Sequence, residues 1–375
     1  TGINGTRVSS TDKFSYVASV TGYTSIGTVT YVPTAGYSGT VTIPFSAYTA
    51  SGTVINGTVS IKVTATSTVI FTDVPTTGPQ SWAYPYINRL ASAGVVAVIG
   101  TYGSAVTEAT QNILAESELV QIGTGSTSVR LTEKGLPLFF RTCPRDDAQG
   151  KAAAAAIIKA GYKKVALLHD NSFYAKGLAE ESQAALEKAG VKIIFYDALT
   201  PGERDYTAIL TKLKAANPDL IFFTGYYPET GMLLRQKKEM GWDVPMMGGD
   251  AANHQDLVKI AGPEAAAGYF FVSPPLPQDM DTNEAKNFLK AFKDRYKTVP
   301  VSVWAVLAGD AYKVLEAAIA KGNDNPEKIA EWLKQLKELP TLSGKMGFDE
   351  KGDRVGDFYR IYKVNNAGKF ELQAR

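Results

Sequence analysis

The 375-residue sequence predicts an α/β protein with parallel sheets flanked by helices, preceded by a small all-β domain. Short apolar runs that do not alternate with polar residues follow a Gly or Asn at four places. These Gly and Asn residues are 29, 27 and 24 residues apart, the length of one strand plus one crossover helix. Near the start, Thr and Val instead alternate with period two between glycines, which is typical of antiparallel strands with one exposed face.

The four apolar runs predict a parallel sheet that is covered on both faces. They span residues 165–168, 193–196, 220–223 and 244–247, and they follow Gly161, Gly190, Asn217 and Gly241. A continuous apolar strand buries both of its faces, so helices must cover the sheet above and below. Small ligands bind at the carboxyl ends of such strands, which directs attention to segments 170–174, 225–229 and 248–253.

Residues 1–94 differ in composition from the rest of the chain. They contain six charged side chains, and Ser or Thr supplies 26 of the first 68 residues. Segments with period-two alternation of β-branched or aromatic residues are 27–32, 39–45 and 57–63. We therefore predict a small all-β domain over 1–68, followed over 69–94 by a linker and a short amphipathic helix.

Both of these segments resemble modules of bacterial surface proteins. Segments 31–40 and 57–63 are similar to Ig-like or cadherin-like repeats. Residues 71–96 are similar to the first half of an S-layer homology motif, a cell-wall-anchoring module whose second half is missing here. The resemblance implies cell-wall polysaccharide as a partner, while a plain amphipathic connector explains the same apolar stripe of Tyr86, Leu90 and Ala93.

Six stretches in the remaining chain form a specific pattern. They are VVAVIGTYGS (95–104), LTEKG (131–135), FFRTCPRDDAQG (139–150), HDNSFYAKG (169–177), GYYPETG (225–231) and MGGD (247–250). Together they make residues 95–363 resemble the leucine/isoleucine/valine-type periplasmic solute-binding proteins, the two-lobed type I receptors that feed ABC transporters. That resemblance implies a ligand-binding domain over 95–375 with the site between its lobes.

The resemblance also implies how the chain is divided between the lobes. Lobe 1 would comprise 95–143 and 277–340, lobe 2 would comprise 144–272, and the C-terminal strands would lie in 341–375. Family members place about two βα units before the strand that matches 95–99. Here the surface-protein-like β segment stands in that place. We therefore expect lobe 1 to be incomplete, as in a chimera, a rearranged gene or a fragment.

The expected ligand chemistry assigns candidate site residues. The carboxylate of a zwitterion needs hydroxyl and backbone N–H donors, and its ammonium needs a carboxylate and aromatic faces. By the resemblance, the carboxylate-binding positions are Ser104, Gly125, Ser126 and Thr127, and the ammonium-facing positions are Tyr174, Tyr226 and Asp250. In simpler interpretations, Ser104 and Thr127 are helix N-caps and the two tyrosines are half-buried aromatics at a sheet edge.

Two positions depart from the leucine-binding members of that family. Asp250 stands where many carry the longer Glu, and Ser302, beside Trp304, stands where they carry an aromatic residue. Both changes enlarge or polarise the pocket. Branched aliphatic amino acids are therefore candidates beside polar or aromatic amino acids and small carboxylates.

Composition excludes several other functions. The 39 basic and 37 acidic residues give a net charge of +2, which predicts neither nucleic-acid binding nor a basic membrane patch. One cysteine and two histidines are too few for a His/Cys zinc site. No nucleotide-binding or hydrolase motif occurs, and Cys143 lacks an evident histidine partner, so we predict a buried structural thiol. We expect no enzyme activity, no cofactor and no metal.

These observations favour an extracytoplasmic solute-binding protein, located in the periplasm or on the bacterial cell surface. It would capture an amino-acid-like ligand by hinge closure and present it to the membrane permease of an ABC transporter. Two alternatives stay open. One is a structural or adhesion protein anchored to the cell wall, and the other is a receptor whose closure signals to another protein.

Overall fold

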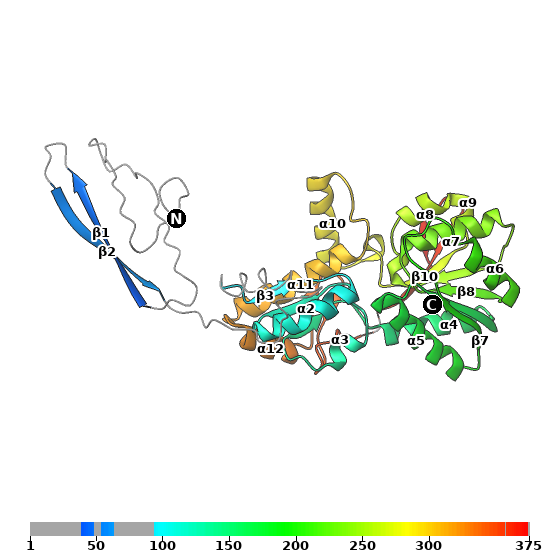
Figure 1. Ribbon diagram of the computed structural model, residues 1–375, viewed down its shortest axis with the longest axis horizontal. Helices are drawn as coiled ribbons and strands as arrows, with labels where there is room; N and C mark the ends of the chain where they lie inside the picture. The colour runs from blue at the N-terminus through cyan, green and yellow to red at the C-terminus, as the bar shows by residue number, and fades with distance from the viewer. Residues whose placement is uncertain (1–38, 49–53, 64–93, 357, 374–375) are drawn as a thin grey trace. The chain divides into compact units, whose positions relative to one another are not determined.

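A computed structural model describes residues 39–48, 54–63, 94–356 and 358–373. The chain separates into two compact units, Thr1–Thr72 and Asp73–Arg375. The described part of the first unit is one antiparallel hairpin of β1 (Gly39–Tyr48) and β2 (Val54–Val63), with Gly39 opposite Val63 (Figure 1). The rest of the predicted Ig-like domain and the S-layer-like half motif lie outside the described residues, so both stay predictions.

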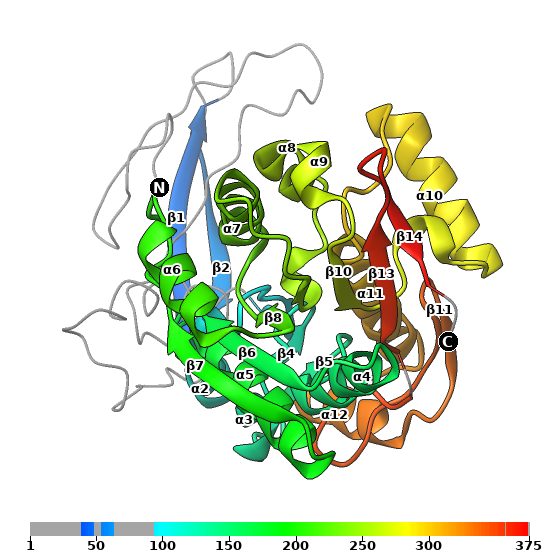
Figure 2. The ribbon, with the colours of Figure 1, turned by 90° about the vertical axis from the view of Figure 1, so that its right-hand side faces the viewer.

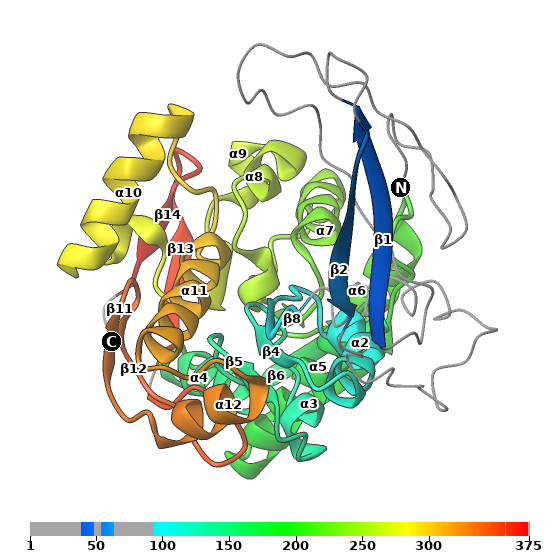
Figure 3. The same ribbon diagram turned by 90° about the vertical axis from the view of Figure 1, so that its left-hand side faces the viewer.

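The second unit contains two α/β lobes. Lobe 1 is built on a three-stranded parallel sheet in the order β3-β4-β5. Its strands are β3 (Ala97–Ile99), β4 (Val120–Gly123) and β5 (Phe139–Arg141). Its main helices are α2 (Ser104–Glu116), α3 (Arg130–Glu133), α10 (Asn283–Tyr296), α11 (Trp304–Ala320) and α12 (Pro326–Gln335) (Figure 3). The core joins Ile122 of β4 to Val314 of α11 and Leu333 of α12.

Lobe 2 is built on a seven-stranded sheet in the order β14-β13-β10-β9-β8-β6-β7. The parallel strands are β6 (Lys164–His169), β7 (Lys192–Ala198), β8 (Leu220–Phe223), β9 (Met246–Gly248) and β10 (Phe270–Ser273). The antiparallel strands β13 (Arg360–Val364) and β14 (Phe370–Leu372) complete one edge. The four apolar runs predicted from the sequence overlap β6 to β9, so the predicted parallel sheet is confirmed.

Helices cover both faces of this sheet. One face packs against α4 (Asp146–Lys159) and α5 (Phe173–Lys188). The other packs against α6 (Thr207–Ala216), α7 (Tyr227–Glu239), α8 (Asp256–Ala261) and α9 (Pro263–Ala266) (Figure 2). The four residues of β8 are at most 1% exposed, as expected for a central strand buried on both sides. The centre of the seven-stranded sheet is therefore covered on both faces.

A buried ion network joins the segments that pass between the lobes. Arg141, at the end of β5, is fully buried, and its Nε lies 2.5 Å from Asp353 Oδ1. Arg145 Nη1 lies 2.8 Å from Asp353 Oδ2, so one carboxylate holds two guanidinium groups. Burial alone would raise the pKa of Asp353, but the charges and hydrogen bonds of both arginines outweigh it and lower that pKa. These contacts fix the chain where lobe 1 meets lobe 2.

Strands β11 (Leu339–Thr341) and β12 (Gly344–Met346) form a separate antiparallel pair that packs beside α10 and α11. Two 3-10 turns, η2 (Asp250–Ala252) and η3 (Pro277–Asp279), follow β9 and β10. Among the helices in the described ranges, none is long and apolar enough to cross a membrane.

Candidate functional site

One small pocket lies where the carboxyl ends of strands from both lobes meet. Its lining residues are Tyr102, Ser104, Gly125, Tyr174, Tyr226, Asp250, Ala251 and Trp304. The cavity measures about 10 Å³, which is room for about one water molecule. Residues of both lobes line this cavity, which is too small for an amino acid, so binding of one requires the lining residues to move apart.

The lobe 1 half of the pocket is the start of a helix. Ser104 is the first residue of α2, and Gly103 at the N-cap offers no side chain to the unpaired N–H groups of the first turn. A helix N-terminus carries partial positive charge, which favours a carboxylate there. Ser104 Oγ itself accepts a 3.2 Å hydrogen bond from the N–H of Ser128, so it also braces the loop after β4.

Gly125, in that loop, allows a close approach between two backbone segments. A Cβ atom at this position would lie 2.4 Å from the Tyr102 ring, so only glycine lets the ring pack against the loop. Tyr102 also packs edge-on against Trp304, with ring centroids 5.4 Å apart. These two aromatic rings close the lobe 1 side of the pocket.

Three predicted site residues do not line this pocket. Ser126 is fully buried, and its hydroxyl donates to the carbonyl of Thr101 at 2.9 Å. Thr127 is also fully buried, and its carbonyl accepts from the N–H of Asp146 at 3.0 Å. Ser302 Oγ accepts from the N–H of Trp304 at 3.1 Å. The side chains of Ser126 and Ser302 and the backbone of Thr127 hold the surrounding segments in place, and direct ligand contact by these three residues stays a prediction.

The lobe 2 half of the pocket is a buried carboxylate between aromatic rings. Tyr174 lies in the first turn of α5, Tyr226 is the N-cap of α7, and Asp250 opens η2 after β9. The two tyrosine rings lie 5.4 Å apart at 54°. The Tyr174 hydroxyl donates to Asp250 Oδ1 at 2.9 Å. Aromatic faces around a carboxylate are the surroundings that an ammonium group requires.

Gly249 makes this arrangement possible. A Cβ atom there would lie 2.7 Å from both the Tyr174 hydroxyl and Gln149 Oε1. Gln149 Oε1 in turn accepts a 2.8 Å hydrogen bond from the N–H of Asp250. The absence of a side chain at position 249 therefore lets lobe 2 fix the position of the Asp250 carboxylate.

The electrostatics of Asp250 prepare it for a cation. Burial raises the pKa of Asp250 to about 6, although hydrogen bonds, including those from Tyr174 and Tyr359, oppose the rise. The Tyr359 hydroxyl donates to Asp250 Oδ2 at 3.3 Å. Burial and the charge of Asp250 also raise the pKa of the buried Asp146 well above its usual range. A ligand that brings positive charge beside Asp250 would offset the cost of ionising this buried carboxylate.

Sequence reasoning missed several contributors to this pocket. Tyr102 and Trp304 were not selected, although Tyr102 follows β3 at the carboxyl edge where ligands bind, which was a usable signal. Gln149 and Tyr359 are 101 and 109 residues from Asp250 along the chain. No local pattern links such distant positions, so only the fold reveals them.

The single cysteine of the chain is not placed as a nucleophile. Cys143 is fully buried among apolar residues of lobe 1, and burial raises the pKa of its thiol to about 12. A thiol of that pKa is protonated at neutral pH and is a poor nucleophile. Within the described ranges, no group of three His, Cys, Asp or Glu side chains is placed to hold a metal ion.

Comparison with known proteins gives a consistent result. A family model described as periplasmic binding protein matches residues 78–369. The chain is 34% identical over 279 residues to the Leu/Ile/Val-binding protein homolog 1 of Brucella abortus, covering 74% of each chain. It is 33% identical over 278 residues to the leucine-, isoleucine-, valine-, threonine-, and alanine-binding protein of Pseudomonas aeruginosa, covering 74% of this chain and 73% of that protein.

Solved structures agree with these relatives. The leucine binding protein LivK of Thermotoga maritima superposes with a TM-score of 0.73 at 29% identity, covering 80% of this chain and 85% of that one. The branched-chain amino acid transporter substrate binding protein LivJ of Streptococcus pneumoniae, in complex with isoleucine, gives a TM-score of 0.71 at 31% identity, covering 78% and 83%.

Proposed function

The chain belongs to the periplasmic binding protein family, and we propose that its cleft captures an L-amino acid for an ABC-type transporter. Its two-lobed α/β fold agrees with that role, because ligand binding between hinged lobes is a recurring use of domain closure. The matched relatives are binding proteins of transport systems rather than enzymes, which fits the chemistry of the cleft. Membership in this family places the protein outside the cytoplasm.

The observation that carries the proposal is the pairing of opposite charges across one pocket. Asp250 supplies a buried carboxylate on lobe 2, and the N-terminus of α2 at Ser104 supplies partial positive charge on lobe 1. A zwitterion neutralises both ends at once, whereas a simple carboxylate would leave Asp250 buried without a cation. Leu, Ile, Val, Thr and Ala are the first candidates, because relatives are named for binding them.

The proposed site comprises all the residues that the sequence selected. Ser104, Gly125, Tyr174, Tyr226 and Asp250 line the closed pocket and are assigned direct ligand contact. Ser126, Thr127 and Ser302 hold the loops on the lobe 1 side and are assigned supporting positions.

Partners beyond the ligand follow from the family. The closed form is proposed to dock on the permease of an ABC transporter. A signalling partner would recognise the same closed form. The cell-wall polysaccharide expected from residues 69–94 rests on chain that the structure does not describe, and it remains a separate proposal.

A thermal-shift screen of the twenty amino acids tests the proposed function. A bound ligand stabilises by about 2.7 kcal/mol at a concentration of 100 times its Kd, so a true ligand raises Tm by several degrees. We expect at least one of Leu, Ile, Val, Thr or Ala to do so, and the shift to vanish in Asp250→Asn. The absence of a shift with every amino acid at about 1 mM would contradict the proposal, because about 1 mM is 100 times a Kd of roughly 10 μM.

A further inference from the structure

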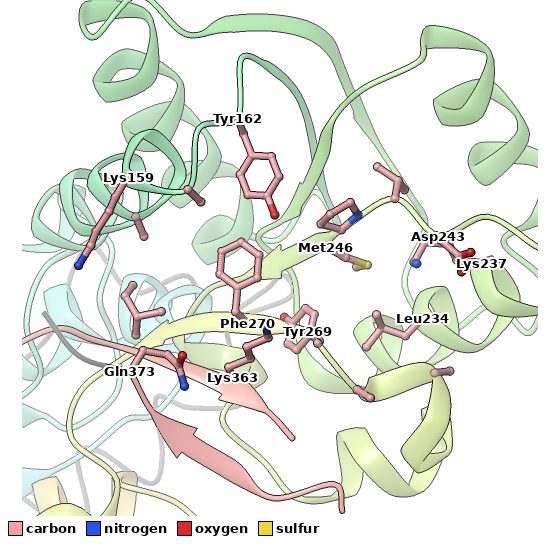
Figure 4. A pocket seen from close by; sticks show the side chains of 18 of the residues that line it. Lys159, Tyr162, Leu234, Lys237, Asp243, Met246, Tyr269, Phe270, Lys363 and Gln373 are labelled. Carbon is pink, nitrogen blue, oxygen red and sulfur yellow. The ribbon is translucent and has the colours of Figure 1, made fainter. Parts of the chain in front are cut away.

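Two cavities in the second unit differ in how movement of the lobes affects them. The amino-acid pocket is lined by residues of both lobes. A larger cavity of about 850 Å³ lies within lobe 2, and its walls include Tyr162, Phe270 and Lys363 (Figure 4). Only the amino-acid pocket has walls that part when one lobe swings away from the other. A contact that joins the lobes beside this pocket therefore bears on ligand binding.

One such contact joins the start of α3 in lobe 1 to the first two turns of α5 in lobe 2. Arg130 Nη2 lies 2.7 Å from Glu180 Oε2. The Arg130 guanidinium also lies over the Phe173 ring, with Cζ 5.5 Å from the ring centroid. A Cβ atom at Gly177 would lie 3.6 Å from Ser128 Oγ, so the chain before α3 also packs against α5. We call Arg130, Glu180 and Phe173 the lobe latch.

The lobe latch lies next to the amino-acid pocket in both lobes. Phe173 directly precedes Tyr174, which lines the pocket, and Arg130 follows the loop that contains Gly125, which lines it too. Because α3 and α5 belong to different lobes, a hinge motion that widens the pocket carries Arg130 away from α5. The three latch residues do not line the pocket themselves, so they act on the ligand through the position of the lobes.

We propose that the lobe latch holds the lobes closed over a bound amino acid and so slows its release. This inference rests on the proposed function of the cleft. The Arg130 and Glu180 side chains are 56% and 42% exposed, so their attraction is modest and is screened by salt. Arg130, Glu180 and Phe173 are therefore positioning residues that adjust the dissociation rate, whereas Asp250 and the N-terminus of α2 recognise the ligand.

A double-mutant cycle on the full chain tests the lobe latch. The probe is the amino acid that raises Tm most, and its dissociation is followed by tryptophan fluorescence, because Trp304 lines the pocket. Arg130→Met and Glu180→Gln should each speed dissociation about twofold to fivefold, and the double variant should release no faster than Arg130→Met. Arg130→Lys should restore part of the wild-type rate, because it keeps the ion pair but lacks the planar face that lies over Phe173.

A matched ion pair within lobe 1 serves as the control. Lys134 Nζ lies 2.7 Å from Glu108 Oε1, the same separation as in the lobe latch, but both residues belong to lobe 1. Lys134→Met and Glu108→Gln should therefore change the dissociation rate by less than about 1.5-fold. An equal effect from this pair and from the lobe latch overturns the proposal.

Salt separates the lobe latch from the contacts of the ligand itself. An exposed ion pair is screened by salt, whereas charges buried in the pocket are screened much less. Raising NaCl from about 50 to about 500 mM should speed dissociation from the wild type about twofold and leave Glu180→Gln unchanged. Equal salt dependence of the two proteins, or additive effects of the two latch substitutions, overturns the lobe latch and leaves the proposed function standing. If no amino acid binds the wild type, the proposed function fails, and the lobe latch fails with it.

Discussion

The two lobes support their halves of the site with unequal amounts of structure. Lobe 2 holds Asp250 beside a seven-stranded sheet with helices on both faces. In residues 94–356 and 358–373, the sheet of lobe 1 has three strands, and β3 at its edge has Ile99 38% exposed. This chain spans about 74% of the length of the relatives that it matches.

The difference teaches which part of the ligand needs the more rigid support. A buried carboxylate must be held against its own desolvation, and Gln149, Tyr174 and Tyr359 all bond to the Asp250 residue for that purpose. A helix N-terminus needs no such network, because its N–H groups belong to the backbone and are already aligned. The smaller lobe can therefore supply the carboxylate-binding half of the cleft.

The largest effect should come from removing the carboxylate at the centre of the buried ion network. Asp353→Asn leaves Arg141 buried without its counterion, and it should lower the free energy of unfolding by about 3–5 kcal/mol. Glu133→Gln is the matched control, because Glu133 forms exposed ion pairs with Arg145 and Lys351, and it should cost at most about 1 kcal/mol. Denaturant unfolding measures both, and similar costs for the two variants would contradict a structural role for Asp353.

Asp250→Asn should separate stability from function in lobe 2. The pKa of Asp250 is raised from 3.8 to about 6, so its ionisation opposes folding, and the unliganded stability falls as pH rises from 3.8 to about 6. The neutral amide should therefore stabilise the empty protein by up to about 3 kcal/mol at pH 7. Ligand affinity should fall by at least about 100-fold, because the ammonium loses a buried charge partner. Thermal melts and calorimetry check the two signs, and a destabilised variant would refute the first.

Affinity for the amino acid should depend on pH in a stated direction. An ammonium requires ionised Asp250, so binding should be independent of pH above about 7 and should weaken about tenfold per unit below about 6. Asp146 and Asp170 are other charged groups that act on the cleft residue Tyr226, and the Asp250→Asn variant removes only the contribution of Asp250. Calorimetry between pH 5 and 8 measures the slope, and affinity that improves on acidification would be incompatible with this role.

Two serines on the lobe 1 side should behave differently. Ser104 lines the pocket and braces Ser128, so Ser104→Ala should weaken binding roughly tenfold, the loss of about one hydrogen bond to a charged group. Ser302 caps a turn beside Trp304 and does not line the pocket, so Ser302→Ala should change affinity by less than about twofold. A larger effect at Ser302 would show that it reaches the ligand when the lobes open.

The smallest effect should be a difference in amide hydrogen exchange between the sheets of the two lobes. Amide hydrogens of β3 should exchange with solvent faster than those of β8, since β3 is half-exposed and β8 is buried on both faces. Hydrogen exchange of the unliganded protein measures the difference. Equal protection would mean that lobe 1 is as firmly supported as lobe 2.

Local patterns in the sequence predicted the framework of lobe 2 but not its tertiary connections. The run 220–223 is strand β8 because four adjacent apolar residues need cover on both faces. Positions after such strands led to Tyr226 and Asp250, which the structure brings to one pocket. No local pattern predicted that β13 and β14 add antiparallel strands to the edge of this sheet, because strand order depends on packing between distant segments. The Tyr102 ring over Gly125 could likewise be recognised only in the folded chain.

A crystal structure of the chain with L-leucine, or with whichever amino acid gives the largest thermal shift, tests the central claim most directly. We predict the ligand ammonium within about 3 Å of the Asp250 carboxylate and the ligand carboxylate at the N–H groups of Ser104 and the loop at Gly125. A ligand in the reverse orientation, or one bound only outside this pocket, would contradict the account.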